Sequence, residues 1–261
     1  MTKLIILICL TILISPVSAS EVLKIAYGDG YAPFAWMGER QAKGVQIDFL
    51  DEILVQRLGF EVHHVACPWK RCQRLVENAE LDGFFTVPTD SRAEYTEKTK
   101  SPFYTTNFLI HTKKDHPLLC EFQSIRSLEE LLQMQGLRHV FMRGSGWHEQ
   151  NLAGLKNITQ VADAAVIPKL LVQNRADLYL EQAEMFKYQA SQLGLQDQLV
   201  SLSSPVIKRQ GWHLFIGKSS LHVGIVAQVD SLLEDMQSTG ELEQLRRIIF
   251  ARYGILTVPK A

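Results

Sequence analysis

The stretch FFTVPTDSRAEYTEKTKSPFY, residues 84–104, determines how the rest of the chain is interpreted. The mostly apolar residues 81–85 lead into it and predict a short strand. Pro88 ends that strand, because proline has no backbone N–H to donate and restricts the residue before it. The polar residues 89–91 then offer side-chain oxygens that suit a turn or a helix N-cap. We therefore expect a helix to begin here, with Arg92 just inside it.

Arg92 stands at the positive end of that expected helix, where a cation is electrostatically unfavourable. One explanation is that its guanidinium reaches across a cleft to an anion, since the planar fork binds a carboxylate through two parallel bonds. The other explanation is a solvated arginine that pairs with Glu94 or Glu97. The stretch alone leaves both explanations open.

The first nineteen residues have the pattern of an export signal. Lys3 supplies a positive start, residues 4–14 form an aliphatic run, and small residues precede a cleavage site after Ala19. The apolar run is shorter than the roughly 20 residues that span a bilayer. We expect residues 1–19 to be a cleaved signal peptide and the mature protein to be periplasmic.

Composition excludes some classes of partner. Removal of Lys3 with the signal leaves 26 basic and 28 acidic residues, a net charge of −2, and no basic run is present. Neither nucleic acid nor an anionic membrane surface is therefore an expected partner. Cys67, Cys72 and Cys120 remain in the mature chain. Cys67 and Cys72 are near enough in sequence to form a disulfide in an oxidising compartment, but buried free thiols fit the sequence as well.

Strand and helix patterns alternate in two blocks. In the first block we expect strands at 22–27, 60–66 and 81–85, with helices after residue 44 and at 69–77. Such alternation predicts parallel pairing with right-handed crossovers. An extended run at 105–112 is followed by the second block, with a capping box of Ser127 and Glu130, helices at 128–134, 147–155, 164–172 and 182–193, and strands at 139–142, 158–161 and 177–180. A strand at 211–216 and helices at 221–237 and 241–253 end the chain.

This order predicts an α/β protein with two lobes, the second inserted into the first. The expected first lobe contains residues 20–112 and 205–261, and the second contains residues 113–204. The polar segment 113–117 and the segment 203–205 are the expected crossings between them.

Ligands of open parallel sheets bind beyond the carboxyl ends of the strands. The loop after the first strand brings Tyr31, Phe34 and Trp36 to that edge, where they could stack on a ligand or simply pack the loop. Gly144, Ser145 and Gly146 fall between a strand and a helix, where backbone N–H groups can bind an anion or form a tight turn. Glu181 and Gln182 reach the same edge and could accept bonds from an ammonium group or face solvent.

Other chemistry finds little support. His63 and Cys67 share one face of a strand while His64 points to the other, which leaves a metal site a ligand short. No catalytic triad or nucleotide-binding loop stands at a usable spacing. We expect no metal, no cofactor and no catalytic residue.

Seven short motifs occur in order: Tyr31-x-Pro33-Phe34, Gly44-x-x-x-Asp48, Asp82-Gly83, Thr89-x-x-Arg92, Ser101-Pro102-Phe103-Tyr104, Gly144-Ser145 and Ala176-Asp177. In this order they closely resemble solute-binding protein family 3, the periplasmic amino-acid-binding proteins of ABC transporters. The resemblance covers essentially the whole mature chain. It implies the type II periplasmic-binding-protein-like fold, in which two crossing strands form a hinge between the lobes.

The resemblance also implies roles for single residues. Arg92 matches the arginine that pairs with the ligand carboxylate, and Ser145 matches a hydroxyl residue that shares it. Tyr31 and Phe34 match aromatic residues of the first lobe. Two positions depart from the family pattern. Phe84, Phe85 and Val87 stand where members that bind polar amino acids carry Ser or Thr, and simple spacing places Gln182 where they carry the carboxylate for the ligand's amino group. Either Glu181 serves instead through a register change, or the ligand is not an ordinary α-amino acid. The candidate ligand-binding residues are Arg92, Ser145, Tyr31, Phe34, Trp36, Trp69, Val87, Gly144 and Glu181.

The sequence thus predicts a monomeric periplasmic protein that captures a small carboxylate-bearing metabolite, an amino acid, and delivers it to an ABC permease. Two alternatives remain. One is an enzyme on the same scaffold, similar to cyclohexadienyl dehydratase, for which Glu181 is the candidate general acid. The other is a sensing module that presents its ligand to a membrane receptor.

Overall fold

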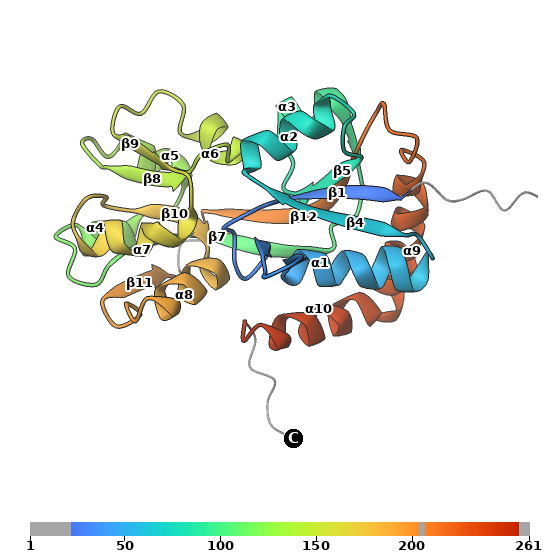
Figure 1. Cartoon of the computed structure of the whole chain (residues 1–261). Helices are drawn as coiled ribbons and strands as arrows, with labels where there is room; N and C mark the ends of the chain where they lie inside the picture. The colour runs from blue at the N-terminus through green and yellow to red at the C-terminus, as the bar shows by residue number, and fades with distance from the viewer. Residues whose placement is uncertain (1–21, 204–206, 256–261) are drawn as a thin grey trace, which may run out of the picture.

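The computed structural model describes residues 22–203 and 207–255. It is an α/β fold of two lobes joined by two long strands, β7 (Tyr104–Lys113) and β12 (Lys208–Gly217), which run from one lobe into the other (Figure 1). The expected signal peptide at 1–19 and the expected boundary at 204/205 lie outside the described residues. The exact limits of the two lobes stay a prediction.

The first lobe is built on parallel strands, as expected. Strand β1 (Leu23–Gly28) lies between β4 (Val62–Cys67) and β5 (Gly83–Thr86) and pairs in parallel with both. Beyond β5, β12 adds to the sheet in the antiparallel direction and also pairs with β6 (Thr96–Lys98). The other elements of this lobe are the hairpin β2 (Trp36–Met37) with β3 (Ala42–Lys43), helix α1 (Val45–Leu50) with its π-helical continuation η1 (Asp51–Arg57), α2 (Trp69–Glu77), α3 (Asp90–Tyr95), α9 (Ile225–Thr239) and α10 (Glu241–Arg252).

The hinge strands carry the connection themselves. The first half of β7 pairs antiparallel with β12, from Tyr104 opposite Trp212 to Phe108 opposite Lys208. The second half of β7 pairs with β10 (Tyr179–Gln182) and β11 (Leu199–Leu202) of the second lobe. Because one strand belongs to the hydrogen-bonded ladders of both lobes, the sheet is continuous through the hinge.

The second lobe repeats the alternation on a smaller scale. Its strands β8 (His139–Met142) and β9 (Ile158–Val161) pair in parallel, and both have the predicted bounds. Half of the predicted capping box is present: the Ser127 hydroxyl accepts the backbone N–H of Glu130 at 3.2 Å, but the Glu130 carboxylate accepts the backbone N–H of Arg126 at 2.7 Å instead of that of Ser127. The helices are α4 (Leu119–Ser124), α5 (Leu128–Gln133), α6 (Gly146–Asn151), the 3-10 turn η2 (Ala164–Val166), α7 (Ile167–Val172) and α8 (Ala183–Gln192).

Several elements differ from the sequence expectation. The hairpin β2–β3, the short strands β6 and β11 and helix α4 were not expected, because segments of two to six residues carry too little periodicity to be recognised. Strand β10 begins and ends two residues later than predicted. This shift places Glu181 within the strand rather than after it, where its direction is fixed by the pleat.

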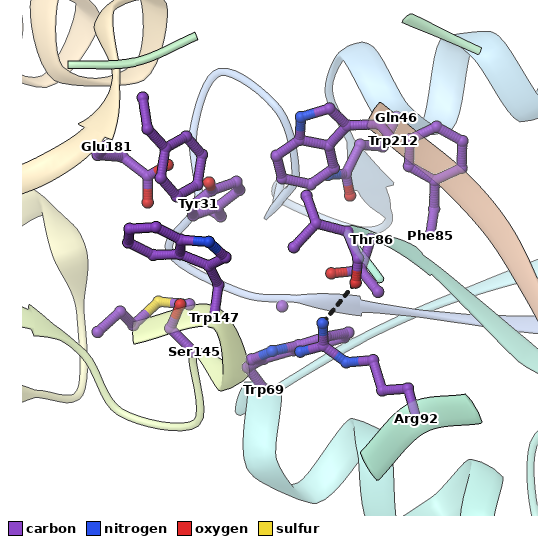
Figure 2. Close-up of a pocket in the computed structure, with 14 residues that line it drawn as sticks. Tyr31, Gln46, Trp69, Phe85, Thr86, Arg92, Ser145, Trp147, Glu181 and Trp212 are labelled. Carbon is purple, nitrogen blue, oxygen red and sulfur yellow. Dashed lines mark hydrogen bonds between the residues drawn. The ribbon is translucent and has the colours of Figure 1, made fainter. Parts of the chain in front are cut away.

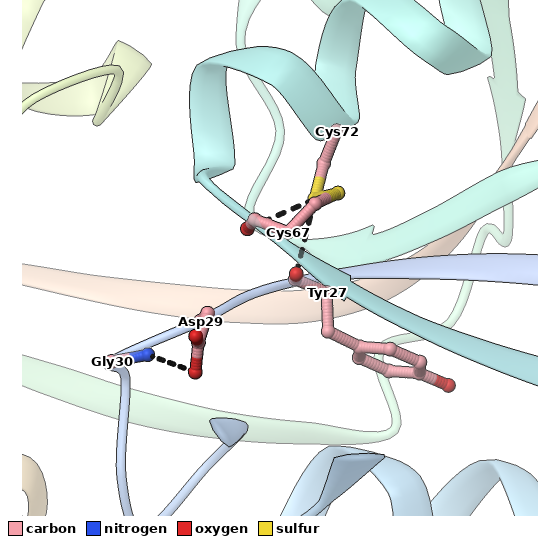
Figure 3. The surroundings of a disulfide bond; sticks show 5 residues. All are labelled: Tyr27, Asp29, Gly30, Cys67 and Cys72. Atoms are coloured by element: carbon pink, nitrogen blue, oxygen red, sulfur yellow. Dashed lines mark hydrogen bonds between the residues drawn. A yellow bond between two sulfur atoms is a disulfide. The ribbon is translucent and has the colours of Figure 1, made fainter. Parts of the chain in front are cut away.

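A disulfide joins Cys67 at the end of β4 to Cys72 in α2 (Figure 3). Of the two alternatives that the sequence left open for these cysteines, the disulfide is therefore present and the buried free thiols are not. The Cys72 sulfur is buried 3.0 Å from the carbonyl oxygen of Tyr27 on β1. Cys120 is free and exposed. Within residues 22–203 and 207–255, no helix has both the length and the apolar character needed to cross a bilayer.

Candidate ligand-binding site

A cavity of about 50 Å³ lies between the lobes, which is room for a few water molecules. Figure 2 shows its lining, with Arg92 and Glu181 on opposite sides. The lining residues of the first lobe and hinge are Gly28, Tyr31, Gln46, Trp69, Phe85, Thr86, Val87, Arg92, Phe108 and Trp212; those of the second lobe are Met142, Ser145, Trp147 and Glu181.

Arg92 is held by its own lobe. It lies in α3, and its residue is only 2% exposed. Its Nη1 donates to the carbonyl oxygen of Val87 at 2.6 Å, and its Nε donates to the side-chain oxygen of Gln73 at 3.2 Å. The guanidinium carbon lies 5.3 Å from the ring centre of Trp69, a distance typical of cation–π contacts. These contacts fix the plane of the guanidinium.

No carboxylate of the described residues lies within ion-pair distance of Arg92, although Glu149 acts on its charge from farther away. Among the described residues no acidic group forms an ion pair with Arg92, and its Nη2 makes no hydrogen bond. Burial lowers the pKa of Arg92 to about 10, so the group stays charged at neutral pH. A buried unpaired charge is costly, and an anion in the cavity would relieve that cost.

Glu181 is the corresponding acidic group of the second lobe. It is 3% exposed, and its carboxylate accepts the Tyr179 hydroxyl at 3.1 Å and the backbone N–H of Gln182 at 3.0 Å. Burial raises the pKa of Glu181 to about 7, although both of these donors oppose the rise. No basic side chain of the described residues pairs with it. Gln182 does not line the cavity, because its amide donates to the Tyr31 hydroxyl at 2.8 Å.

Ser145 is tied to a buried histidine. The Ser145 hydroxyl lies 2.7 Å from Nδ1 of His148, whose Nε2 lies 2.6 Å from the carbonyl oxygen of Leu180. A carbonyl oxygen only accepts, so Nε2 carries the proton; burial lowers the pKa of His148 to about 4, so the ring is neutral. Nδ1 therefore accepts the Ser145 hydroxyl hydrogen. In this arrangement Ser145 turns an acceptor lone pair, rather than a donor, toward the cavity.

Trp147 provides an unused donor. Its indole Nε1 is buried without a hydrogen-bond partner among the described residues, while Trp147 lines the cavity next to Ser145. Trp212, which lines the cavity from the hinge strand β12, already donates its indole N–H to the Thr106 hydroxyl at 2.9 Å. A buried N–H without a partner is costly, so a ligand acceptor would stabilise Trp147 in this position.

The lobes touch around the cavity. The side-chain amide of Gln73 donates to the carbonyl oxygen of Gly144 at 3.1 Å, and that of Gln150 donates to Asp90 at 2.8 Å. At Gly146 a Cβ atom would lie 3.4 Å from Nη2 of Arg92 and closer still to Thr89, so glycine permits the close approach. The structure is therefore a closed arrangement of the two lobes.

The structure brings most of the predicted site residues together. Arg92, Ser145, Tyr31, Trp69, Val87 and Glu181 all line the cavity. Phe34 does not: it is fully buried and stacks on Trp212 with ring centres 5.9 Å apart. Trp36 lies in β2 and packs edge-on against Tyr253. Gly144 does not line the cavity either, and its backbone N–H, which was expected to bind an anion, donates to the Glu149 carboxylate at 3.2 Å.

Sequence reasoning missed the remaining lining residues. Trp147 follows Gly144-Ser145-Gly146 directly, so its place at the expected anion-binding turn was a usable signal. Gln46 and Trp212 carried no comparable signal, because a buried helix residue and a hinge-strand residue look like core in a sequence. No group of three or more His, Cys, Asp or Glu side chains in the described parts of the chain could hold a metal ion.

The sequence pattern of the bacterial extracellular solute-binding proteins, family 3, matches residues 23–251. The chain belongs to this family. The match extends over both lobes and the hinge, so the resemblance inferred from the seven motifs is confirmed. No curated protein matches the sequence.

Solved structures confirm the two-lobed fold of this solute-binding protein. A histidine kinase sensor domain with similarity to periplasmic binding proteins aligns with a TM-score of 0.72 and 18% identity, covering 89% of this chain and 96% of its own. The arginine-, lysine-, histidine-binding protein ArtJ of Geobacillus stearothermophilus aligns with a TM-score of 0.70 and 16% identity, covering 88% and 96%. An ancestral amino acid-binding protein, a precursor of cyclohexadienyl dehydratase, aligns with a TM-score of 0.64 and 20% identity, covering 89% and 95%. At these identities the likeness establishes the fold alone.

Proposed function

We propose that this solute-binding protein captures a free amino acid between its lobes. The observation that supports this proposal is that two buried side chains of opposite charge face one cavity from its two sides. Arg92 and Glu181 are both buried, belong to different lobes, and form no ion pair with any described residue. An amino acid carries a carboxylate for the first and an ammonium for the second, so one ligand would neutralise both.

The geometry at Arg92 suits a carboxylate. Val87 and Gln73 engage Nη1 and Nε, while Nη2 makes no bond to a described residue. The side chain is thereby held in one orientation before the ligand arrives, which lowers the entropic cost of binding. The unpartnered Nε1 of Trp147 is a second donor for the same carboxylate or for a polar group of the ligand.

Binding would be coupled to lobe closure. A carboxylate on Arg92 and an ammonium on Glu181 link the lobes through the ligand, in addition to the direct contacts of Gln73 and Gln150. The free protein would then open at the hinge strands, and the ligand would shift the population toward the closed form.

The cellular role that fits is capture for an ABC importer. We propose a monomer that is exported to the periplasm by residues 1–19, cleaved after Ala19 and recognised in its closed form by a permease. One protein of the same fold is the substrate binding protein of an amino acid ABC transporter. Sensing for a membrane receptor remains the competing use of the same closure, since a histidine kinase sensor domain shares the fold.

One observation favours an enzyme as the second candidate. A carboxyl group whose pKa is raised to about 7 is suited to act as a general acid, and Glu181 has this property in a closed cavity. A dehydratase of the cyclohexadienyl type would use such a group to protonate a leaving hydroxyl.

The test is ligand binding by the purified mature protein. We expect a pool of the twenty amino acids to raise the melting temperature of the wild type, because a ligand specific for the folded state stabilises it. Arg92→Ala and Glu181→Gln should abolish most of that shift. No shift with the wild type would overturn the proposal. Incubation with prephenate and arogenate, followed by product detection, tests the enzyme: turnover favours it, and binding without product rejects it.

A further inference from the structure

The charges of the cavity wall balance each other. Among the fourteen lining residues, Arg92 is the only one with a basic side chain and Glu181 is the only one with a carboxyl group. His148 stands behind Ser145 and is neutral, because burial lowers its pKa to about 4. The wall therefore provides one positive and one negative partner and no more.

An amino acid would use both partners with its main-chain groups. If Arg92 binds the carboxylate and Glu181 binds the ammonium, a charged side chain on the ligand has no counter-ion left in the lining. Moving an unpaired charge out of water into a protein interior costs several kcal/mol. Aromatic faces such as Trp69 and Trp212 attract a cation by about 0.5–2 kcal/mol, which is too little to offset that cost.

The rest of the wall is suited to an uncharged group. Phe85, Trp212 and Met142 contribute apolar surface, and Gln46 and Thr86 contribute neutral polar groups. The cavity volume of about 50 Å³ in the closed arrangement favours a short side chain over a long one. The lack of a further counter-ion therefore argues against lysine, arginine, aspartate and glutamate, and the small volume argues additionally against the long side chains of lysine and arginine.

We propose that the ligand is an amino acid with a short, uncharged side chain, and that the cavity rejects amino acids with a charged side chain. This inference rests on the proposed function and narrows it. It also distinguishes this chain from proteins of the same fold that bind arginine, lysine or histidine.

Calorimetric titration with single amino acids at pH 7.5 tests the inference. We titrate all twenty amino acids, with glycine, alanine, serine, threonine and valine as the neutral probes and lysine, arginine, aspartate and glutamate as the charged probes. We expect at least one neutral probe to bind at least a hundredfold more tightly than every charged probe. A charged probe that binds as tightly as the best neutral one overturns the inference but leaves the proposed function intact. If none of the twenty amino acids binds, the proposed function fails and the inference fails with it.

A designed change of specificity adds a second readout. Gln46→Glu places a second carboxylate in the wall with almost no change in shape, and Gln46→Met is the matched neutral control. Relative to the wild type, Gln46→Glu should raise the lysine-to-alanine affinity ratio at least tenfold, whereas Gln46→Met should leave it unchanged. An unchanged ratio in a Gln46→Glu protein with a normal circular dichroism melt counts against the charge argument. The wild-type titration decides the question if that variant does not fold.

Discussion

Gln73 and Arg92 are joined by a 3.2 Å hydrogen bond from the guanidinium Nε to the glutamine side-chain oxygen. The amide nitrogen of the same Gln73 donates to the carbonyl oxygen of Gly144 in the second lobe at 3.1 Å. One side chain therefore contacts both the proposed ligand-binding arginine and the opposite lobe. Gln73 requires the lobes to be closed for its second bond, so it couples the orientation of Arg92 to closure.

We predict that Gln73→Ala weakens amino acid binding about fivefold to tenfold, because it removes one bond to a charged group and one bond between the lobes. Titration calorimetry measures the loss, and stopped-flow fluorescence should assign it to faster ligand release. The matched control is Gln150→Ala, which removes an exposed interlobe bond to Asp90 without touching Arg92. Equal losses in the two variants would contradict a special role for Gln73.

Replacement of Arg92 should have the largest effect on binding. Charge-assisted hydrogen bonds contribute roughly 1.5–3 kcal/mol each, so Arg92→Ala should weaken binding about tenfold to a hundredfold or more. Arg143→Ala is the control, because Arg143 is exposed at the end of β8 and outside the cavity lining. An Arg92→Ala protein that binds as tightly as the wild type would show that the ligand carboxylate, if there is one, lies elsewhere.

Affinity should depend on the ionisation of Glu181. The ammonium group of the ligand needs a carboxylate, and the pKa of Glu181 in the free protein is raised to about 7 by burial. We therefore expect binding at pH 6 to be about tenfold weaker than at pH 8. In Glu181→Gln this dependence should vanish along with most of the affinity. A wild-type affinity that stays constant from pH 6 to 8 would refute the assignment.

The ionisation of Glu181 should lower the stability of the ligand-free protein as pH rises, whereas it should raise the affinity for the ligand. The folded-state pKa of Glu181 lies above the unfolded value near 4.5, so the folded state binds more protons between these pH values. The contribution of Glu181 is fully present below about pH 4.5 and is lost as pH rises through about 7, a difference of about 3 kcal/mol. Glu181→Gln should thus raise the melting temperature at pH 8 and not at pH 4. Melting curves at the two pH values, without ligand, measure it.

The disulfide should stabilise the first lobe. Cys67 and Cys72 are five positions apart. Closing so short a loop lowers the conformational entropy of the unfolded chain, which stabilises the folded state by about 2 kcal/mol. The double variant Cys67→Ser, Cys72→Ser should therefore melt about 4–8 °C lower than the wild type. A reductant should lower the melting temperature of the wild type to near that of the double variant and should leave the melting temperature of the double variant unchanged. If the reductant lowers both equally, the effect does not come from this bond.

The fold could be predicted to a large extent because its signals are local. The apolar run before Pro88 became β5, and the alternation around it gave the parallel trio β4–β1–β5. The hinge was harder to place. The sequence suggested crossings in polar segments next to the strands, whereas β7 itself pairs with strands of both lobes. Antiparallel pairing between residues about a hundred positions apart cannot be recognised from the composition of either segment.

The sequence by itself determined that Arg92 lies just inside a helix that follows a strand, and that Glu181 and Gln182 lie at the end of another strand. Residue type and position relative to a strand or helix end suffice for such inferences. Only the tertiary structure decided that Glu181 faces the cavity, that Phe34 lies behind it, and that Trp147 presents an unpaired donor. The physical reason is that side-chain direction in a strand reverses with every residue. Because β10 extends to Gln182 and pairs with β7, Glu181 and Gln182 point to opposite faces of the sheet, and only Glu181 lines the cavity. The pairing partner lies about seventy residues away, so the residues around Glu181 do not reveal it.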